Sequence, residues 1–316
     1  MTNLFSKFCG LLANRIVNDI HKGRSPRLKQ KIYNIISPYI DPVVNVYVGN
    51  NKLKMLFSQK TPYYYATYST YDRALPRICE MVQKIDKYLI IIDIGANIGD
   101  TASLISEKVN GASILCIEGD KIFLQFLYEN SLSIKNNTVF IEPKYCVDTL
   151  NNNKFNVENK NGTAHLSISK NTTIENINTL DNIVNGHKIF LNTNLLKIDT
   201  DGFEITVLNG AKELLESKHP IVFFEFTPEA YISNKQNPMG LIKLLCLFGY
   251  EKALFYDNFG KVEGIYNFND NNIIQRKIDE IDNNKVYYYD ILCIHKTDEE
   301  KYMKILENEL KQKNDT

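Results

Sequence analysis

The sequence predicts an α/β protein built on a seven-stranded, mostly parallel sheet with an antiparallel last strand. Three observations predict this fold. Residues 89–92 are a short apolar run without alternation, which is typical of a strand buried on both faces of a parallel sheet. From there on, strand-like runs alternate with helix-like segments, as in successive βαβ units. The final two strand-like runs, Ala253–Tyr256 and Tyr288–His295, form a hairpin-like end that suits an antiparallel strand.

The central prediction is that residues 89–101 form a strand, a tight turn and the start of a helix. Asp93 ends the apolar run, and small or polar residues follow at every second position, namely Gly95, Asn97 and Gly99. Gly and Asn adopt positive-φ backbone at the lowest cost. Asp100 is the expected cap of the helix that follows. A strand that leads through such a turn into a helix N-terminus predicts a binding site for a nucleotide-like ligand.

The segments before this strand are predicted in three parts. Residues 1–40 are basic and helical. An alternating pattern at Val43–Val48 and Lys52–Phe57, separated by a Gly-Asn-Asn turn, predicts a β-hairpin. An aromatic-rich stretch then leads into a helix at Ala74–Lys84, with a break near Pro76.

The segments after the central strand complete the alternation. The sequence predicts loops in the Asn-rich tracts 151–161 and 268–273, and an exposed helix in the tail from Thr297. We divide the chain into a basic arm (1–40), a hairpin with an aromatic-rich lead-in helix (41–80), a main domain (81–296) and a charged tail (297–316). Further strands are expected at 113–117, 138–142, 194–199 and 221–226, and further helices at 120–130, 207–215 and 240–248.

The composition is that of an ordinary globular chain, with 44% hydrophobic and 23% charged residues. The formal net charge is zero, so nothing in the overall balance favours nucleic acid as a partner. Charge is nevertheless uneven, because residues 1–40 hold seven Lys or Arg and one acid. The arm is therefore compatible with peripheral contact to an anionic membrane or a partner, although a solvated helix packed beside the domain is the simpler interpretation.

Nothing in the sequence predicts export or membrane insertion. Charged and polar residues interrupt the segment 4–20, which excludes a signal-peptide pattern, and no apolar run reaches transmembrane length. The six cysteines are scattered without a CxxC pair, which favours reduced, buried thiols over disulfides or zinc ligands. We therefore expect a cytoplasmic protein.

Acidic residues end four of the predicted strands: Asp93, Glu118, Asp199 and Glu225. In an open parallel sheet, ligands bind beyond the carboxyl ends of the strands. Four carboxylates at one edge repel one another unless their partner is cationic or polyhydroxylated. S-adenosylmethionine offers a sulfonium, an ammonium and a ribose diol, whereas a dinucleotide would bring phosphates to an acidic edge.

The turn also distinguishes between these two cofactors. Its sequence, Gly95-Ala-Asn-Ile-Gly99, lacks the G-x-G-x-x-G that brings backbone close to a pyrophosphate. Glu118 ends the next strand, where an acid can accept hydrogen bonds from ribose hydroxyls. No spacing of acids, His or Cys requires a metal. The cofactor-binding residues that we predict are Asp93, Gly95, Asn97, Gly99, Glu118 and Gly119.

Three blocks of the sequence resemble the FkbM-type S-adenosylmethionine-dependent methyltransferases. They are Ile92–Gly99, Thr179–Val184 and, most specifically, Leu196–Glu204 followed by Val207–Ala211. The resemblance covers residues 85–296 and implies a Rossmann-like class I methyltransferase fold with S-adenosylmethionine as cofactor. One departure bears on pocket shape and choice of acceptor: this chain has Thr200-Asp-Gly-Phe-Glu204 where the family usually has Val-Glu-Gly-Ala-Glu.

The resemblance implies methyl transfer to a hydroxyl, and we expect one on a sugar or glycan precursor, such as that of a bacterial surface polysaccharide. Such a reaction needs positioning of the acceptor and a base for the hydroxyl proton. Asp199 is the first candidate for either role, with Asp201, Glu204 and His165 as further catalytic candidates. Glu204 could instead stabilise the first turn of the next helix, and His165 could be a solvated loop residue. Lys197 is expected to pair with an acid.

Two rival functions remain open on the sequence alone. A nicotinamide-dependent dehydrogenase is disfavoured by the missing third glycine and by the acidic strand ends. A methyltransferase-like scaffold would bind a glycan or a partner without turnover. A dehydrogenase should not bind S-adenosylhomocysteine, whereas binding without methyl transfer would favour the scaffold.

Overall fold

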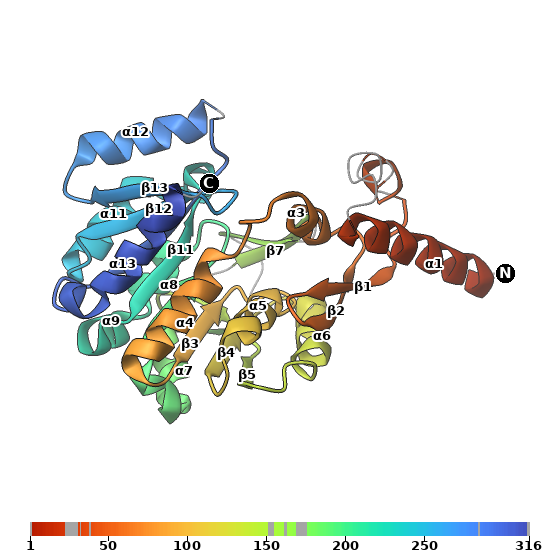
Figure 1. Cartoon of the computed structure of the whole chain (residues 1–316), viewed down its shortest axis with the longest axis horizontal. Helices are drawn as coiled ribbons and strands as arrows, with labels where there is room; N and C mark the ends of the chain where they lie inside the picture. Colours follow the sequence, from red (N-terminus) through yellow and green to blue (C-terminus); the bar gives the residue numbers. More distant parts are fainter. Residues whose placement is uncertain are drawn as a thin grey trace.

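The structure is a computed structural model and describes residues 2–22, 31, 33–37, 39–150, 155–160, 163–168, 176–283 and 285–314. Its centre is an eight-stranded sheet with the order β13-β12-β14-β11-β10-β3-β4-β5 (Figure 1). In chain order, these strands are β3 (Ile90–Ile94), β4 (Ser113–Ile117), β5 (Thr138–Glu142), β10 (Leu195–Ile198), β11 (Ile221–Phe226), β12 (Lys252–Asp257), β13 (Val262–Asn267) and β14 (Tyr289–Ile294).

The Rossmann-like topology expected from the sequence is confirmed. Strands β5, β4, β3, β10 and β11 pair in parallel, and the last strand, β14, is antiparallel. It lies between β11 and β12 instead of at an edge. The predicted count of seven strands was one short, because β13 pairs antiparallel to β12 at the edge of the sheet. Its sequence contains Gly264 and polar residues, so its strand signal is weak.

Neighbouring residues of β3 face opposite sides of the sheet and belong to two different cores. Ile92 packs on the side covered by α7 (Leu180–Gly186), α8 (Glu204–Asn209), α9 (Lys212–Lys218), α11 (Pro238–Leu247) and α12 (Asn271–Asp282). Ile91 packs on the side covered by α4 (Ala74–Asp86), α5 (Asp100–Lys108), α6 (Lys121–Ser131) and α13 (Glu299–Asn314). Burial on both faces explains why this strand has an unbroken apolar run.

The N-terminal part of the chain forms a third apolar cluster at one end of the molecule. The predicted hairpin is confirmed as β1 (Val43–Val48) and β2 (Asn51–Leu56), which pair antiparallel. α1 (Thr2–His21) packs on this hairpin, and α5 and α6 complete the cluster. Figure 1 shows α1 at the end of the molecule opposite to α12 and β13. α3 (Thr61–Thr67) lies beside α1 and leads toward α4.

Several predictions of helices and loops were wrong. α4 runs without a break, because Pro76 lies in its first turn, where its missing N–H has no helical partner. The helix expected at 207–215 is divided at Gly210 and Ala211 into α8 and α9. The first Asn-rich tract includes the strand β7 (Phe155–Lys160), which pairs antiparallel with β8 (Thr163–Ile168), and the second includes the start of α12, which Asp270 caps. α13 is a helix as predicted, but it is not an exposed one, since Tyr302 and Ile305 are buried.

The remaining short elements connect the main ones. No helix among the described residues is long and apolar enough to cross a membrane. All six cysteines have free thiols, and only Cys246 is partly exposed. The short elements are β6 (Tyr145–Cys146), β9 (Ile177–Asn178), the 3-10 helix η1 (Lys188–Asn192) and α10 (Pro228–Ser233).

Candidate active site

A cavity of about 430 Å³ lies at the carboxyl ends of β3, β4, β10 and β11, where the sequence predicted ligand binding. The lead-in segment between β2 and α4 and residues of β14 add further walls. Parallel strands bring their carboxyl ends to one edge, so residues far apart in the chain meet here. Seven carboxylic acids and three lysines line the cavity: Asp72, Asp100, Glu118, Asp199, Asp201, Glu225 and Asp290, with Lys60, Lys144 and Lys197.

The turn after β3 has the positive-φ backbone that its glycines and asparagine predicted. The φ angles of Gly95, Asn97 and Gly99 are +76°, +47° and +85°. A Cβ at Gly95 would lie 1.8 Å from the carbonyl oxygen of Asp199, so no larger residue fits there. Gly99 is the N-cap of α5, which corrects the prediction that Asp100 caps this helix. The Asp100 side chain is instead part of the cavity wall.

Glu118 is fixed by the backbone of two neighbouring turns. Its Oε2 accepts a hydrogen bond from the Asn97 N–H at 2.9 Å, and its Oε1 accepts one from the Asp120 N–H at 2.8 Å. Burial raises the pKa of Glu118 to about 7, against the opposite effect of these backbone donors. Each carboxylate oxygen keeps a lone pair for a ligand hydroxyl. Glu118 is therefore oriented as an acceptor at the cavity wall.

These residues fit S-adenosylmethionine. Glu118 offers carboxylate oxygens to a ribose diol, and the turn Gly95–Asn97 presents backbone at the same wall. Gly119 follows Glu118, and a Cβ there would come within 2.3 Å of the Tyr145 ring, so this position also requires glycine. An excess of acids over lysines suits a cationic cofactor and opposes a pyrophosphate.

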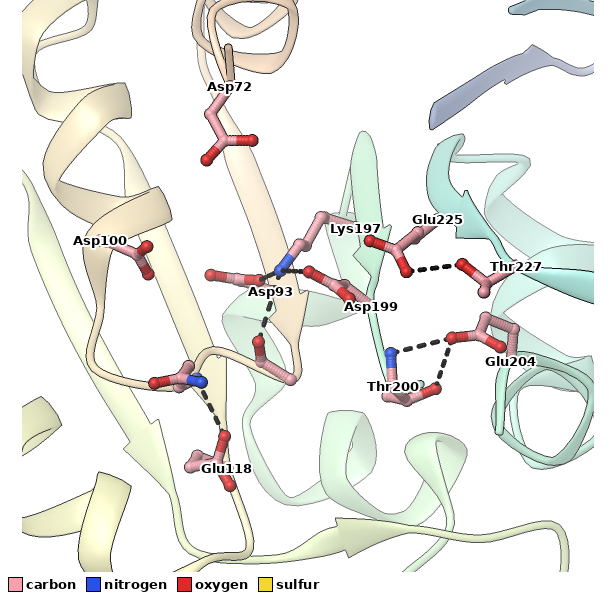
Figure 2. Close-up of polar contacts among 12 residues, drawn as sticks. Asp72, Asp93, Asp100, Glu118, Lys197, Asp199, Thr200, Glu204, Glu225 and Thr227 are labelled. Atoms are coloured by element: carbon pink, nitrogen blue, oxygen red, sulfur yellow. Dashed lines mark hydrogen bonds and ion pairs between the residues drawn. The ribbon is translucent and has the colours of Figure 1, made fainter. Parts of the chain in front are cut away.

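Lys197 is buried at the floor of the cavity, between two of the predicted acids (Figure 2). Its ammonium lies 2.9 Å from Asp93 Oδ1 and 3.3 Å from Asp199 Oδ2, and it donates to the Gly95 carbonyl oxygen at 3.4 Å. Burial disfavours the charged form, but the two carboxylates outweigh burial and raise the pKa of Lys197. The expected pairing of Lys197 with an acid is confirmed.

Asp93 occupies a different place from the one predicted. It is fully buried and does not line the cavity, and its predicted role in cofactor binding stays a prediction. Burial raises the pKa of Asp93 above its usual value, although Lys197 has the opposite effect. Asp93 therefore acts on the site by holding Lys197 from below. β3 and β10 are paired in register at these two residues, which explains their proximity.

Three acids in the cavity wall were missed as site residues: Asp72, Asp100 and Asp290. The Tyr65 hydroxyl lies 3.2 Å from Asp72 Oδ2 and 3.4 Å from Asp100 Oδ2. Burial raises the pKa of Asp72 to about 7. No sequence pattern indicated Asp72, whose place depends on the path of the lead-in segment. Asp290 had a signal in the sequence, because the segment Tyr289-Asp-Ile-Leu292 also resembles the FkbM-type methyltransferases.

Asp290 and Glu225 are directly opposite each other on β14 and β11. Burial, and then neighbouring carboxylates, raise the pKa of both well above the usual range. Glu225 Oε1 also accepts a hydrogen bond from the Thr227 hydroxyl at 2.7 Å. The strand-end acid that the sequence indicated at Glu225 thus has a second acid beside it, supplied by the antiparallel strand.

Of the predicted catalytic residues, two line the cavity and one does not. Asp199 and Asp201 both line the cavity, and burial followed by the charge of Asp199 raises the pKa of Asp201 to about 8. Glu204 does not line the cavity. Its Oε1 accepts hydrogen bonds from the Thr200 N–H at 2.9 Å and the Thr200 hydroxyl at 3.0 Å, so it stabilises the turn after β10. The side chain of His165 lies outside the described residues, and its role stays a prediction.

One other cluster in the described part of the chain has metal-ligand residue types: His219, His295 and Asp298. It lies outside the cavity wall. The two imidazole rings stack with centroids 3.8 Å apart and planes 5° apart. Imidazole lone pairs lie in the ring plane, so stacked rings direct them in parallel and not toward one ion.

Solved structures of methyltransferases are similar to parts of this chain. The methyltransferase FkbM from Methylobacillus flagellatus KT is 18% identical over 53% of this chain and 40% of its own, with a TM-score of 0.33. The plantazolicin methyltransferase BpumL, solved with S-adenosylhomocysteine, is 10% identical over 70% and 82%, with a TM-score of 0.39. A putative caffeoyl-CoA O-methyltransferase from Staphylococcus aureus is 9% identical over 69% and 82%, with a TM-score of 0.36. The match to the FkbM structure thus spans less than half of that chain.

A protein-family profile shows the family to which the chain belongs. Comparison with curated proteins finds no match. The profile of the methyltransferase FkbM domain matches residues 93–252, which is half of the chain. That region includes the turn after β3, Glu118 and the Lys197–Glu204 block, so it contains most of the site described above. The chain therefore belongs to the FkbM methyltransferase family.

Proposed function

We propose that this S-adenosylmethionine-dependent methyltransferase methylates a hydroxyl of a neutral or amine-bearing sugar or glycan precursor, such as that of a bacterial surface polysaccharide. The observation that carries the proposal is the lining of the cavity, in which acids outnumber lysines seven to three. Acids exchange hydrogen bonds with several hydroxyls whether or not they are protonated, and the ionised acids among them would repel an acceptor with phosphate or carboxylate groups. Tyr64, Tyr71 and Tyr288 line the same cavity and offer aromatic faces for sugar rings.

The cofactor side of the reaction belongs to Glu118 and the turn Gly95–Asn97. When bound, S-adenosylmethionine supplies an electrophilic methyl group on a sulfonium. Glu118 would accept hydrogen bonds from the ribose diol, and the turn would hold the cofactor next to β10, since Gly95 directly contacts the backbone of Asp199.

The acceptor side belongs to Asp199 and Asp201. The Asp199 side chain is 42% exposed toward the cavity and is held in an ion pair by Lys197. It would act as the general base that takes the proton from the acceptor hydroxyl. Asp201, with a pKa of about 8, is mostly protonated at neutral pH and so can donate a hydrogen bond to the acceptor.

The test is methyl transfer from labelled S-adenosylmethionine to neutral glycan precursors extracted from the source organism. We expect Asp199→Asn to transfer methyl groups roughly 100- to 10,000-fold more slowly than wild type, the usual range for loss of a general base. Its affinity for S-adenosylhomocysteine, measured by isothermal titration, should be unchanged. Asp279→Asn is the matched control, since Asp279 is exposed on α12, outside the cavity.

Three outcomes would contradict the proposal. Full activity of Asp199→Asn would remove the proposed base. Preferential transfer to phosphorylated or carboxylated acceptors would contradict the argument from the acidic cavity. Tight binding of S-adenosylhomocysteine without transfer to any glycan pool would indicate a scaffold without turnover.

A further inference from the structure

We propose that the outer face of α1 docks on an anionic lipid surface. The inner face of this helix packs on the hairpin and is buried at Ala13, Ile16, Val17 and Ile20. The opposite face is exposed, and we call five of its exposed residues the α1 outer face: Lys7, Leu11, Leu12, Arg15 and Lys22, the last directly after the helix. The helix is therefore both packed on the domain and open to a partner.

The α1 outer face combines cations with large apolar side chains. Leu11 is 73% exposed and Leu12 is 37% exposed. Lys7, Leu11 and Arg15 are spaced by four residues, which places them in one stripe with a leucine between two cations. Helices that lie on membranes have this composition, with apolar residues inserted below the headgroups and long basic side chains reaching back to them.

The charge of the surrounding chain is complementary to an anionic surface. Residues 1–40 contain seven Lys or Arg and one acid, and the remaining residues are net acidic because the whole chain is neutral. In the part of the chain that the structure describes, no acid forms an ion pair with Lys7, Arg15 or Lys22. A nucleic acid would match these charges but would leave the leucines in water, so lipid is the occupant that fits both features.

The position of α1 connects this surface to the cavity. α1 contacts α3, and Thr61 and Tyr64 of α3 line the cavity. Figure 1 shows α1 at one end of the molecule, away from the eight-stranded sheet. Docking would therefore bring one wall of the cavity close to the membrane.

The first test uses the absence of tryptophan from the natural chain. Leu11→Trp introduces a single fluorescent reporter at the α1 outer face. We expect its emission to shift to shorter wavelength with vesicles of equal phosphatidylcholine and phosphatidylglycerol, and not with phosphatidylcholine alone. Leu247→Trp is the matched control, because Leu247 is 83% exposed on α11, and its emission should not change.

The second test measures cosedimentation of the full chain with the same vesicles. Lys7→Gln/Arg15→Gln/Lys22→Gln should bind roughly 100-fold more weakly, because each Lys or Arg near an anionic surface contributes about a factor of five. The control Lys243→Gln/Lys304→Gln/Lys311→Gln removes the same charge from exposed positions elsewhere and should bind like wild type. Circular dichroism checks that both variants are folded.

The proposal is overturned if wild type does not sediment with the mixed vesicles, or if both triple variants lose binding equally. It is also overturned if Leu11→Trp binds vesicles without an emission shift. Binding to a DNA or RNA duplex as tight as binding to vesicles, again without a shift, would assign the surface to nucleic acid.

Discussion

At the scale of single residues, Glu118 shows how burial sets the chemistry of this site. Burial raises its pKa to about 7, although two backbone N–H groups favour its ionised form. Only the carboxylate can accept hydrogen bonds at both oxygens, so the affinity for a ribose-containing ligand should depend on pH. The folded free protein holds this proton up to a pH near 7, and ligand binding should release it.

We therefore predict that affinity for S-adenosylhomocysteine rises as the pH increases through about 7. Glu118→Gln should bind at least roughly tenfold more weakly, because a hydrogen bond to a charged group contributes about 1.5–3 kcal/mol. It should also lose the pH dependence. Isothermal titration at several pH values measures both effects. An unchanged pH dependence in Glu118→Gln would show that another group controls binding.

Lys197 leads to a prediction about stability. Lys197→Met leaves Asp93 fully buried without its cation, and breaking a buried ion pair in this way costs roughly 3–5 kcal/mol in the free energy of unfolding. Asp199→Asn removes the more exposed partner and should cost less than about 1 kcal/mol. Urea unfolding followed by circular dichroism compares the two. Equal losses would mean that Asp93 does not depend on Lys197.

At the scale of elements, Asn130 joins the hairpin to the main domain. Its Oδ1 accepts from the Lys54 N–H of β2 at 2.7 Å. Its Nδ2 donates to the carbonyl oxygens of Lys54 and Ile98, both at 2.9 Å. One buried side chain on α6 thus connects the hairpin to its own helix and to the turn after β3. Apolar packing has no direction, so these hydrogen bonds define how the hairpin is aligned on α6.

We predict that Asn130→Ala loosens this junction. Buried backbone groups left without partners cost about 1–3 kcal/mol each, so the free energy of unfolding should fall by at least roughly 2 kcal/mol. Hydrogen exchange of the β2 amides should accelerate before that of β4. Ser131→Ala is the control, since its hydroxyl makes an exposed bond within α6. Unchanged exchange in β2 would show that apolar packing alone holds the hairpin.

At the scale of the whole molecule, the buried acids determine how stability depends on pH. The pKa of Asp72 is about 7 and that of Asp201 about 8 in the folded protein, against 3.8 for an exposed Asp. The folded chain therefore binds more protons than the unfolded chain between these values. Stability falls with rising pH wherever the folded state holds more protons. Burial, and then the neighbouring His219, lower the pKa of His295, so this histidine affects stability only below its usual value of 6.5.

We predict that the melting temperature of the free protein decreases from about pH 7 to about pH 8.5, a window in which His295 is mostly neutral in both states. Asp72→Asn/Asp201→Asn should flatten this slope, because neither amide titrates. Differential scanning calorimetry across the window measures both. A melting temperature that rises with pH in wild type would contradict the assigned protonation of these acids.

Features encoded in local patterns could be predicted from the sequence. Apolar runs with sharp boundaries fixed strands such as β4, β5 and β11 to the residue, and the Gly and Asn spacing fixed the turn after β3. Because parallel strands end at the same edge, the acids Glu118 and Asp199 could also be placed together. The strand β13 was missed because its sequence contains Gly264 and polar residues. The helix α12 was missed although Ile274, Ile278 and Ile281 recur at helical spacing, because the Asn residues at its start were read as a loop.

Which side chains complete the site depends on contacts between distant segments of the chain. Asp72 comes from the lead-in segment and Asp290 from a strand inserted between β11 and β12, so their approach depends on long-range pairing that no local periodicity contains. The same holds for Asp93, whose place below Lys197 follows from the register of β3 and β10. A sequence pattern states which residues end a strand, but which of them reach the cavity depends on how distant segments pack around them.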